Sequence, residues 1–256
     1  VSIKCTALYS QMSELNYRGC IETLKERLRP LLRQAMKNGV FINLDMEQYA
    51  YKDLILDLAK ELFNEPEFRS YPHFGIVIQA YLKDSYEDLQ GVVQYCKARG
   101  TPITVRLVKG AYWDFEVIQA IQEGWDVPVY TVKENSDANY ERCAKLLLEN
   151  FPYIQAAFGS HNVRSLSFAI AYAEHLGLEK SAFEIQMLYG MADAFKGVLS
   201  EMGYRLREYA PVGEMLPGMA YLVRRLLENS SNESFLKVRY LKPDQAEQFL
   251  KAPKLR

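Results

Sequence analysis

The sequence predicts an α/β protein that folds as one (β/α)8 barrel of the TIM type. The chain has 256 residues, of which 49% are hydrophobic and 25% charged, and such a barrel needs about 250 residues. Short apolar runs alternate with segments of helical spacing along the chain. Polar residues interrupt these runs at their carboxyl ends, which is the end where active sites of such barrels lie.

Eight apolar runs are expected to form the strands of the barrel. They lie within residues 1–9, 40–45, 75–81, 102–114, 127–133, 153–160, 182–188 and 204–210. Segments of helical spacing follow them, at 13–37, 53–63, 85–99, 113–124, 136–150, 164–177, 190–203 and 209–229. Pro30 is expected to kink or divide the first helix, and Ser136 is expected to cap the helix that begins near it.

The barrel is expected to span residues 1–236, with residues 237–256 forming a tail or a peripheral helix. The chain does not begin with Met and opens directly in a run typical of a strand. We therefore expect that it was trimmed at both ends from a longer polypeptide.

Composition excludes several classes of function. A formal net charge of −1 gives no overall attraction to nucleic acid or to an anionic membrane. No apolar run approaches the roughly 18 residues of a membrane span, and no signal peptide is present, so a cytoplasmic protein is expected. The four cysteines and three histidines are scattered, and no HExxH occurs, so no metal site is expected. Neither GxGxxG after a strand nor a P-loop is present.

The last helix, 209–229, carries an unusual polar stripe. Tyr221, Arg224, Arg225 and Glu228 have the i, i+3, i+4, i+7 spacing of one helix face, opposite an apolar face. The simpler interpretation is a solvated face with a weak ion pair between Arg224 and Glu228. The alternative is a binding site, because two guanidinium groups beside a phenol suit a small carboxylate.

The expected catalytic end of the barrel is rich in charge. Its cations are Lys4, Arg106, Lys109, Arg224 and Arg225, and its acids are Asp45, Glu47, Glu116 and Glu228. So many cations predict a ligand with phosphate or carboxylate groups. Asp45 and Glu47 are a candidate acid/base pair, but neighbouring arginines favour ionised carboxylates in structural ion pairs.

Motifs along the chain resemble the flavin-dependent proline dehydrogenase barrel, especially the form found in bifunctional proline utilization A proteins. They are VSIKCTAL, INLD, IQAY, RLVKGAYWDFE, SHN, FEIQMLYGM, YAPVG and YLVRRLLEN, in that order, and they cover residues 1–236. The resemblance implies an FAD enzyme that oxidises L-proline to Δ1-pyrroline-5-carboxylate by hydride transfer to flavin N5. It further implies the first step of proline catabolism to glutamate, a quinone as electron acceptor, and peripheral contact with the membrane.

The resemblance also implies a role for each matching residue. Lys4, Asp45 and Arg106 are implied as catalytic. Lys4, Arg224 and Arg225 are expected to hold the proline carboxylate, with Asp45 orienting the arginines, and the cage around the ring comprises Tyr112, Leu188, Tyr209 and Tyr221. The residues implied for FAD are Gln79, Arg106, Val108, Lys109, Gly110, Trp113, Lys133, Ser160, His161, Asn162, Gln186 and Glu228. Ser160 departs from the Thr that the family often has there, and it keeps the hydroxyl.

Two other classes of function remain open on the residues alone. One is a lyase or aldolase in which Lys4 or Lys109 forms a Schiff base with a keto acid. The other is a barrel without enzymatic activity that serves as a binding scaffold. Bound flavin would separate the flavoenzyme from both.

Overall fold

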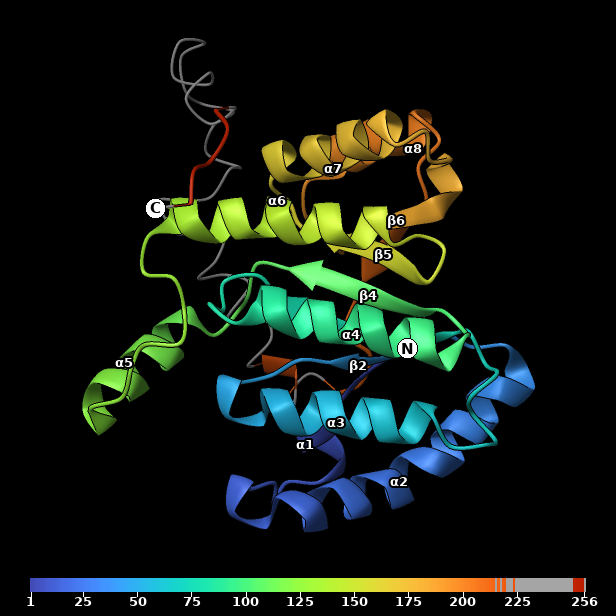
Figure 1. Cartoon of the computed structure of the whole chain (residues 1–256), viewed down its shortest axis with the longest axis vertical. Helices are drawn as coiled ribbons and strands as arrows, with labels where there is room; N and C mark the ends of the chain where they lie inside the picture. The colour runs from blue at the N-terminus through green and yellow to red at the C-terminus, as the bar shows by residue number, and fades with distance from the viewer. Residues whose placement is uncertain (215, 217, 220–222, 224–250, 256) are drawn as a thin grey trace. The chain divides into compact units, whose positions relative to one another are not determined.

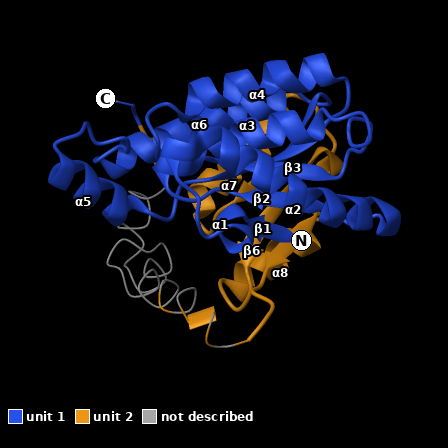
Figure 2. Ribbon diagram, turned by 90° about the horizontal axis from the view of Figure 1, so that it is seen from below, with its two compact units in different colours: residues 1–157, 254–256 blue, residues 158–253 orange. Residues whose placement is uncertain are grey.

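The computed structural model describes residues 1–214, 216, 218–219, 223 and 251–255. The chain forms two compact units, one of residues 1–157 with 254–256 and one of residues 158–253 (Figure 2). The boundary between the two units falls inside one strand, Ile154–Gly159.

The described residues contain seven strands, which follow one another in a sheet in the order of the chain. They are β1 Ser2–Lys4, β2 Ile42–Asp45, β3 Phe74–Gln79, β4 Ile103–Val108, β5 Ile154–Gly159, β6 Phe183–Leu188 and β7 Leu206–Tyr209. Neighbouring strands β1 to β4 are parallel, as are β6 and β7. The prediction of an α/β fold with a parallel sheet is confirmed, and the arrangement is consistent with a TIM-like barrel.

Helices occupy the connections between strands. They are α1 Cys5–Leu8, α2 Tyr17–Asn38, α3 Lys52–Phe63, α4 Ser85–Arg99, α5 Trp113–Glu123, α6 Lys133–Glu149, α7 Val163–His175 and α8 Asp193–Glu201. Three 3-10 turns lie at η1 Glu14–Asn16, η2 Tyr49–Tyr51 and η3 Lys180–Ala182. Within the first unit, α2 packs against α3 and α4 packs against α6, whereas α5 stands apart from this row (Figure 1). No helix in the described part of the chain is long and apolar enough to cross a membrane.

The strand expected at residues 127–133 is absent, so the predicted count of eight is not reached. Only Val129 makes a β-bridge, antiparallel to Leu82, and Val129 is fully buried against Tyr81 and Leu82. Pro128 has no N–H to donate to a neighbouring strand. Val127 and Val129 therefore hold a loop against the core. In the sequence, their alternation cannot be distinguished from that of a strand.

Pro30 does not divide its helix, and the expectation that Ser136 is a helix cap was wrong. Pro30 lies inside α2 without dividing it, because buried Leu28 and Leu32 on either side hold the helix on the core. Helix α6 begins at Lys133, so Ser136 is a buried residue of its first turn and not its cap. The helix expected at 209–229 lies largely outside the described residues.

Arg99, the last residue of α4, closes the amino-terminal edge of the first unit. Its side chain is 4% exposed, and it has no carboxylate partner among the hydrogen bonds of the described residues. The guanidinium instead donates to five backbone carbonyls, those of Phe63, Phe68, Tyr71, Thr101 and Pro102, at 2.9–3.4 Å. One side chain thus provides hydrogen bonds to the end of α3, to the loop that follows it and to the loop that precedes β4.

Candidate functional site

The carboxyl edge of β1 to β4 gathers four of the predicted site residues. Lys4, Asp45 and Gln79 are the last residues of β1, β2 and β3, and Arg106 lies two residues before the end of β4. The register pairs Lys4 with Asp45 and Val77 with Arg106. The prediction that polar side chains meet at this edge is therefore confirmed within the first unit.

Arg106 and Asp45 form a buried ion pair. Arg106 Nη1 donates to Asp45 Oδ1 at 2.6 Å, and Arg106 Nη2 donates to Ser2 Oγ at 2.8 Å. Asn43 Nδ2 donates to the same Asp45 oxygen at 3.2 Å. Asp45 is 6% exposed and Arg106 is 9% exposed, so this pair lets two opposite charges offset each other away from water. Asp45 therefore orients Arg106, whereas Arg224 and Arg225, the arginines that it was expected to orient, lie outside the described residues.

Gln79 presents a buried acceptor that no described residue satisfies. Its Nε2 donates to the backbone carbonyl of Glu47 at 3.3 Å, and its Oε1 is buried without a hydrogen-bond partner. The Glu47 carboxylate accepts from Thr6 N at 3.1 Å and from Thr6 Oγ1 at 2.5 Å, so Glu47 is a structural tie between α1 and β2. An orphaned amide oxygen at this edge suits a ligand that has an N–H or O–H donor.

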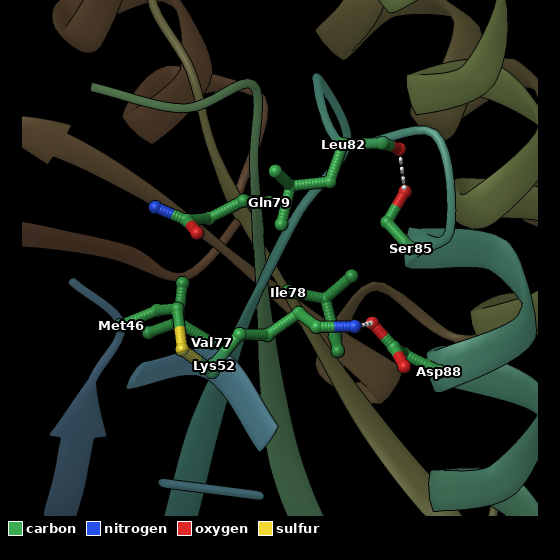
Figure 3. Close-up of a pocket in the computed structure, with 8 residues that line it drawn as sticks. All are labelled: Met46, Lys52, Val77, Ile78, Gln79, Leu82, Ser85 and Asp88. Atoms are coloured by element: carbon green, nitrogen blue, oxygen red, sulfur yellow. Dashed lines mark hydrogen bonds and ion pairs between the residues drawn. The ribbon is translucent and has the colours of Figure 1, made fainter. Parts of the chain in front are cut away.

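A second cluster of charges, formed by Lys52, Asp84 and Asp88, lies near Gln79. Lys52 Nζ binds Asp84 and Asp88, each at 2.7 Å, and the Gln79 amide points away from the Lys52–Asp88 pair (Figure 3). Burial alone would lower the pKa of Lys52, but its hydrogen bonds to the two carboxylates outweigh burial and raise it. This cluster ties the start of α3 to the start of α4.

Lys4 and Tyr112 face one another across this edge. Lys4 Nζ lies 3.3 Å from the Tyr112 hydroxyl and 5.9 Å from the centre of its ring. Tyr112 is the residue before α5, and the next residue, Trp113, donates its indole N–H to the carbonyl of Tyr130 at 2.9 Å. A cation and a phenol are thus held together at the position where the resemblance expects the substrate.

Two further cations share one carboxylate. Lys109 Nζ and Lys133 Nζ both bind Asp137, the latter at 2.8 Å. Burial alone would raise the pKa of Asp137, but the charges of the two lysines lower it. Burial lowers the pKa of Lys109. Two lysines around one acid leave an excess of positive charge beside the strand ends, which favours an anionic ligand group.

The backbone conformation at position 110 and the neighbouring ring of Tyr81 both require a glycine there. The φ of Gly110 is +143°, and a Cβ there would lie 2.3 Å from Cδ1 of the Tyr81 ring.

Gly110→Ala is expected to lower the free energy of unfolding by about 2–4 kcal/mol, because strain and a clash add together. Urea unfolding measures the change. Gly91→Ala on α4, where nothing lies within 4 Å, is the matched control and should stabilise by up to about 1 kcal/mol. Equal effects at the two glycines would contradict the assignment.

The second unit contributes its own set of predicted residues. His161 Nε2 accepts the backbone N–H of Leu188 at 3.0 Å, and Ser160 Oγ accepts that of Asn162 at 3.0 Å. Asn162 caps α7 through Ser165 N at 3.1 Å. Gln186 donates to Glu184. Leu188 and Tyr209, the last residues of β6 and β7, are paired in register.

Four predicted residues lie outside the described part of the chain. They are Tyr221, Arg224, Arg225 and Glu228. The described residues contain no group of three or more His, Cys, Asp or Glu side chains that could hold a metal ion.

Several residues of this edge were not predicted from the sequence as site residues. Asp137 could have been found, because it stands four residues after Lys133 on one helix and so suggests an ion pair. Ser2 carried no such signal, since its partner Arg106 lies on another strand, and Asn43 binds Asp45 two residues along the same strand. Glu116 was noted only as one of several acids, although it is buried.

A parallel α/β sheet with buried and half-buried cations at its carboxyl edge is consistent with a TIM-like barrel, the class of fold whose sites lie at that edge. The family model described as proline dehydrogenase matches residues 1–238, and the chain belongs to the proline dehydrogenase family.

Relatives and solved structures agree with this assignment. The chain is 36% identical over 243 residues to the bifunctional protein PutA of Salmonella typhimurium, covering 92% of this chain and 18% of that protein. It is 29% identical to proline dehydrogenase 2 of Bacillus subtilis, covering 92% of this chain and 67% of that protein. The crystal structure of proline utilization A from Bdellovibrio bacteriovorus, inactivated by N-propargylglycine, matches with a TM-score of 0.95 and 58% identity, over 99% of this chain and 26% of that chain. The chain thus spans about a fifth to a quarter of the PutA proteins that it matches.

Proposed function

We propose that this chain oxidises L-proline to Δ1-pyrroline-5-carboxylate with FAD as cofactor, as the first step of proline breakdown to glutamate. The observation that carries the proposal is the edge where the buried Arg106 cation, the orphaned Gln79 oxygen and the Lys4–Tyr112 pair gather. Family membership then selects among the anionic ligands that such an edge could bind.

The residues present fit a flavin. The isoalloxazine ring has an N–H donor for the Gln79 oxygen and carbonyl acceptors for Arg106, and the FAD phosphates suit Lys109 and Lys133. Bound FAD would supply the oxidant by accepting a hydride at its N5 atom. The residues that would hold it are Gln79, Arg106, Val108, Lys109, Gly110, Trp113 and Lys133, with Ser160, His161, Asn162, Gln186 and Glu228.

The residues proposed for the substrate bind its carboxylate and enclose its ring. Lys4, Arg224 and Arg225 would hold the carboxylate, and Tyr112, Leu188, Tyr209 and Tyr221 would form the cage. The related PutA inactivated by N-propargylglycine supports this proposal, because that compound shares a carboxylate and a secondary amine with proline. Positioning and exclusion of water would be the main contributions of these side chains.

The oxidation is tested by adding L-proline anaerobically to the flavin-loaded protein. We expect the yellow colour of the flavin to bleach. Incubation with N-propargylglycine before L-proline is added is expected to prevent this bleaching. L-alanine, which has a primary amine and no ring, is the matched control. A colourless protein, or a yellow one that L-proline leaves unchanged, contradicts the proposal, and trapping of a keto acid by borohydride would instead support a lyase.

Arg225→Met tests the carboxylate clamp. Loss of a charge-assisted hydrogen bond of about 1.5–3 kcal/mol is expected to raise KM for L-proline about 10- to 100-fold while flavin stays bound. Arg69→Met, at an exposed arginine of the first unit, is the control. An unchanged KM in Arg225→Met would remove Arg225 from the clamp.

A quinone is the proposed final electron acceptor. Because quinones dissolve in the bilayer, the flavin would be reoxidised at the membrane surface. Reoxidation of the reduced flavin by vesicles that contain ubiquinone, compared with vesicles without it, tests the acceptor. The PutA relatives favour a role within a longer bifunctional polypeptide.

A further inference from the structure

Glu116 is a buried acid that the proposed reaction does not use. It lies in the first turn of α5 and is 4% exposed. Burial raises the pKa of its carboxyl group, while a hydrogen bond from the backbone of Tyr49 lowers it by less. Among the ion pairs of the described residues, none involves Glu116. A buried carboxyl group without a cation costs stability, so some other benefit is expected to offset it.

Glu116 joins two segments that carry site residues. Its Oε1 accepts the backbone N–H of Tyr49 at 2.7 Å, and its own N–H donates to the carbonyl of Tyr112 at 2.9 Å. Tyr49 begins the turn η2, two residues after Glu47, whose carbonyl binds Gln79. The start of α5 is thereby tied to the loop that follows β2.

Tyr81 lies beside this junction, and its hydroxyl is buried without a hydrogen-bond partner among the described residues. Burial raises the pKa of Tyr81, and the nearby negative charge of Glu116 raises it further. The ring of Tyr81 packs on Gly110, two residues before Tyr112. Tyr81, after β3, thus lies beside the junction that Glu116 makes between the segments after β2 and β4.

We propose that Glu116 is a positioning residue that holds Tyr112, and through it the Lys4 ammonium, in place for the substrate. Glu116 fixes the first turn of α5, Tyr112 immediately precedes that turn, and the Tyr112 hydroxyl meets Lys4 at 3.3 Å. The effect on substrate rests on the proposed function, whereas the tie between Tyr49 and α5 does not.

The test compares Glu116→Ala with Glu116→Gln in the flavin-loaded protein. The glutamine keeps an oxygen that can accept the Tyr49 N–H, and the alanine does not. Glu116→Ala is expected to raise KM for L-proline about tenfold, equivalent to 1.4 kcal/mol, with kcat and flavin content little changed. Glu116→Gln should restore the KM to within about twofold of the starting protein. Glu123→Ala, at an exposed acid near the end of the same helix, is the control.

A second readout needs no turnover. The chain has two tryptophans, so Trp125→Phe leaves Trp113, beside Tyr112, as the single reporter. In this background, Glu116→Ala should shift the Trp113 emission and increase its quenching by acrylamide, and Glu116→Gln should not. If L-proline does not bleach the flavin but the Trp113 pattern holds, the proposed reaction fails and the positioning role stands.

Three outcomes overturn the inference. One is a Glu116→Ala variant with unchanged KM and unchanged Trp113 emission, and another is a Glu116→Gln variant that behaves like the alanine variant. If the alanine variant does not fold, Glu116→Asp replaces it, because a shorter side chain draws the carboxylate away from Tyr49. Unchanged KM and emission in Glu116→Asp would equally overturn the role.

Discussion

Replacing Asp45 by alanine is expected to abolish bleaching of the flavin by L-proline and to lower the free energy of unfolding by about 3–5 kcal/mol. Asp45 binds Arg106 at 2.6 Å, and both side chains are buried. Without the carboxylate, the buried guanidinium group loses the counter-charge that Asp45 supplies. The predicted loss of activity and the predicted loss of stability therefore have one cause. Unfolding in guanidinium chloride measures the stability, and flavin absorbance measures the activity.

A double variant separates the two effects of Asp45. Asp45→Ala with Arg106→Met removes both charges, so most of the lost stability should return while activity stays absent. Asp45→Asn, which keeps an acceptor for Arg106, should fall between the natural protein and Asp45→Ala. Equal stability of Asp45→Ala and the natural protein would show that the pair contributes little to the fold.

Replacing Arg99 by methionine is expected to lower the free energy of unfolding by about 3–5 kcal/mol. Five backbone carbonyls lose a hydrogen bond at once, and the methionine that fills the space cannot replace any of those bonds. Arg99 lies at the amino-terminal edge of the strands, so KM and kcat of the folded protein should stay close to their natural values. Chemical unfolding and steady-state assays measure the two quantities.

Lys97→Met on the same helix serves as the control for Arg99. Lys97 is exposed, and its replacement should change the free energy of unfolding by no more than about 0.5 kcal/mol. If Arg99→Met impaired KM or kcat as strongly as stability, the two edges of the sheet would be coupled, contrary to expectation.

The carboxyl edge could be predicted from the sequence because strand ends are local features. A polar residue that ends an apolar run, as Lys4, Asp45 and Gln79 do, marks that edge whatever the tertiary structure. The partners of these residues could not be predicted in the same way. Arg106 binds Asp45 from a strand two positions away in the sheet, and spacing in the sequence does not encode that contact.

The missing strand and the missed acid have a common physical reason. Val129 alternates with polar residues as a strand residue would, but it is buried by packing on Tyr81 and Leu82. Glu116 falls on the buried side of a helix whose other large side chains, including Ile118 and Ile121, are exposed. In both cases tertiary contacts with the loop after β3 or β2 overrode the local pattern.

The order of the strands has a consequence for synthesis. In the first unit, each strand from β1 to β4 pairs with the next strand in the chain, so each new pairing needs only residues that have already been made. The Lys4–Tyr112 and Arg106–Asp45 contacts both lie within these residues. A growing chain could therefore assemble half of its site on the ribosome before the second unit is translated.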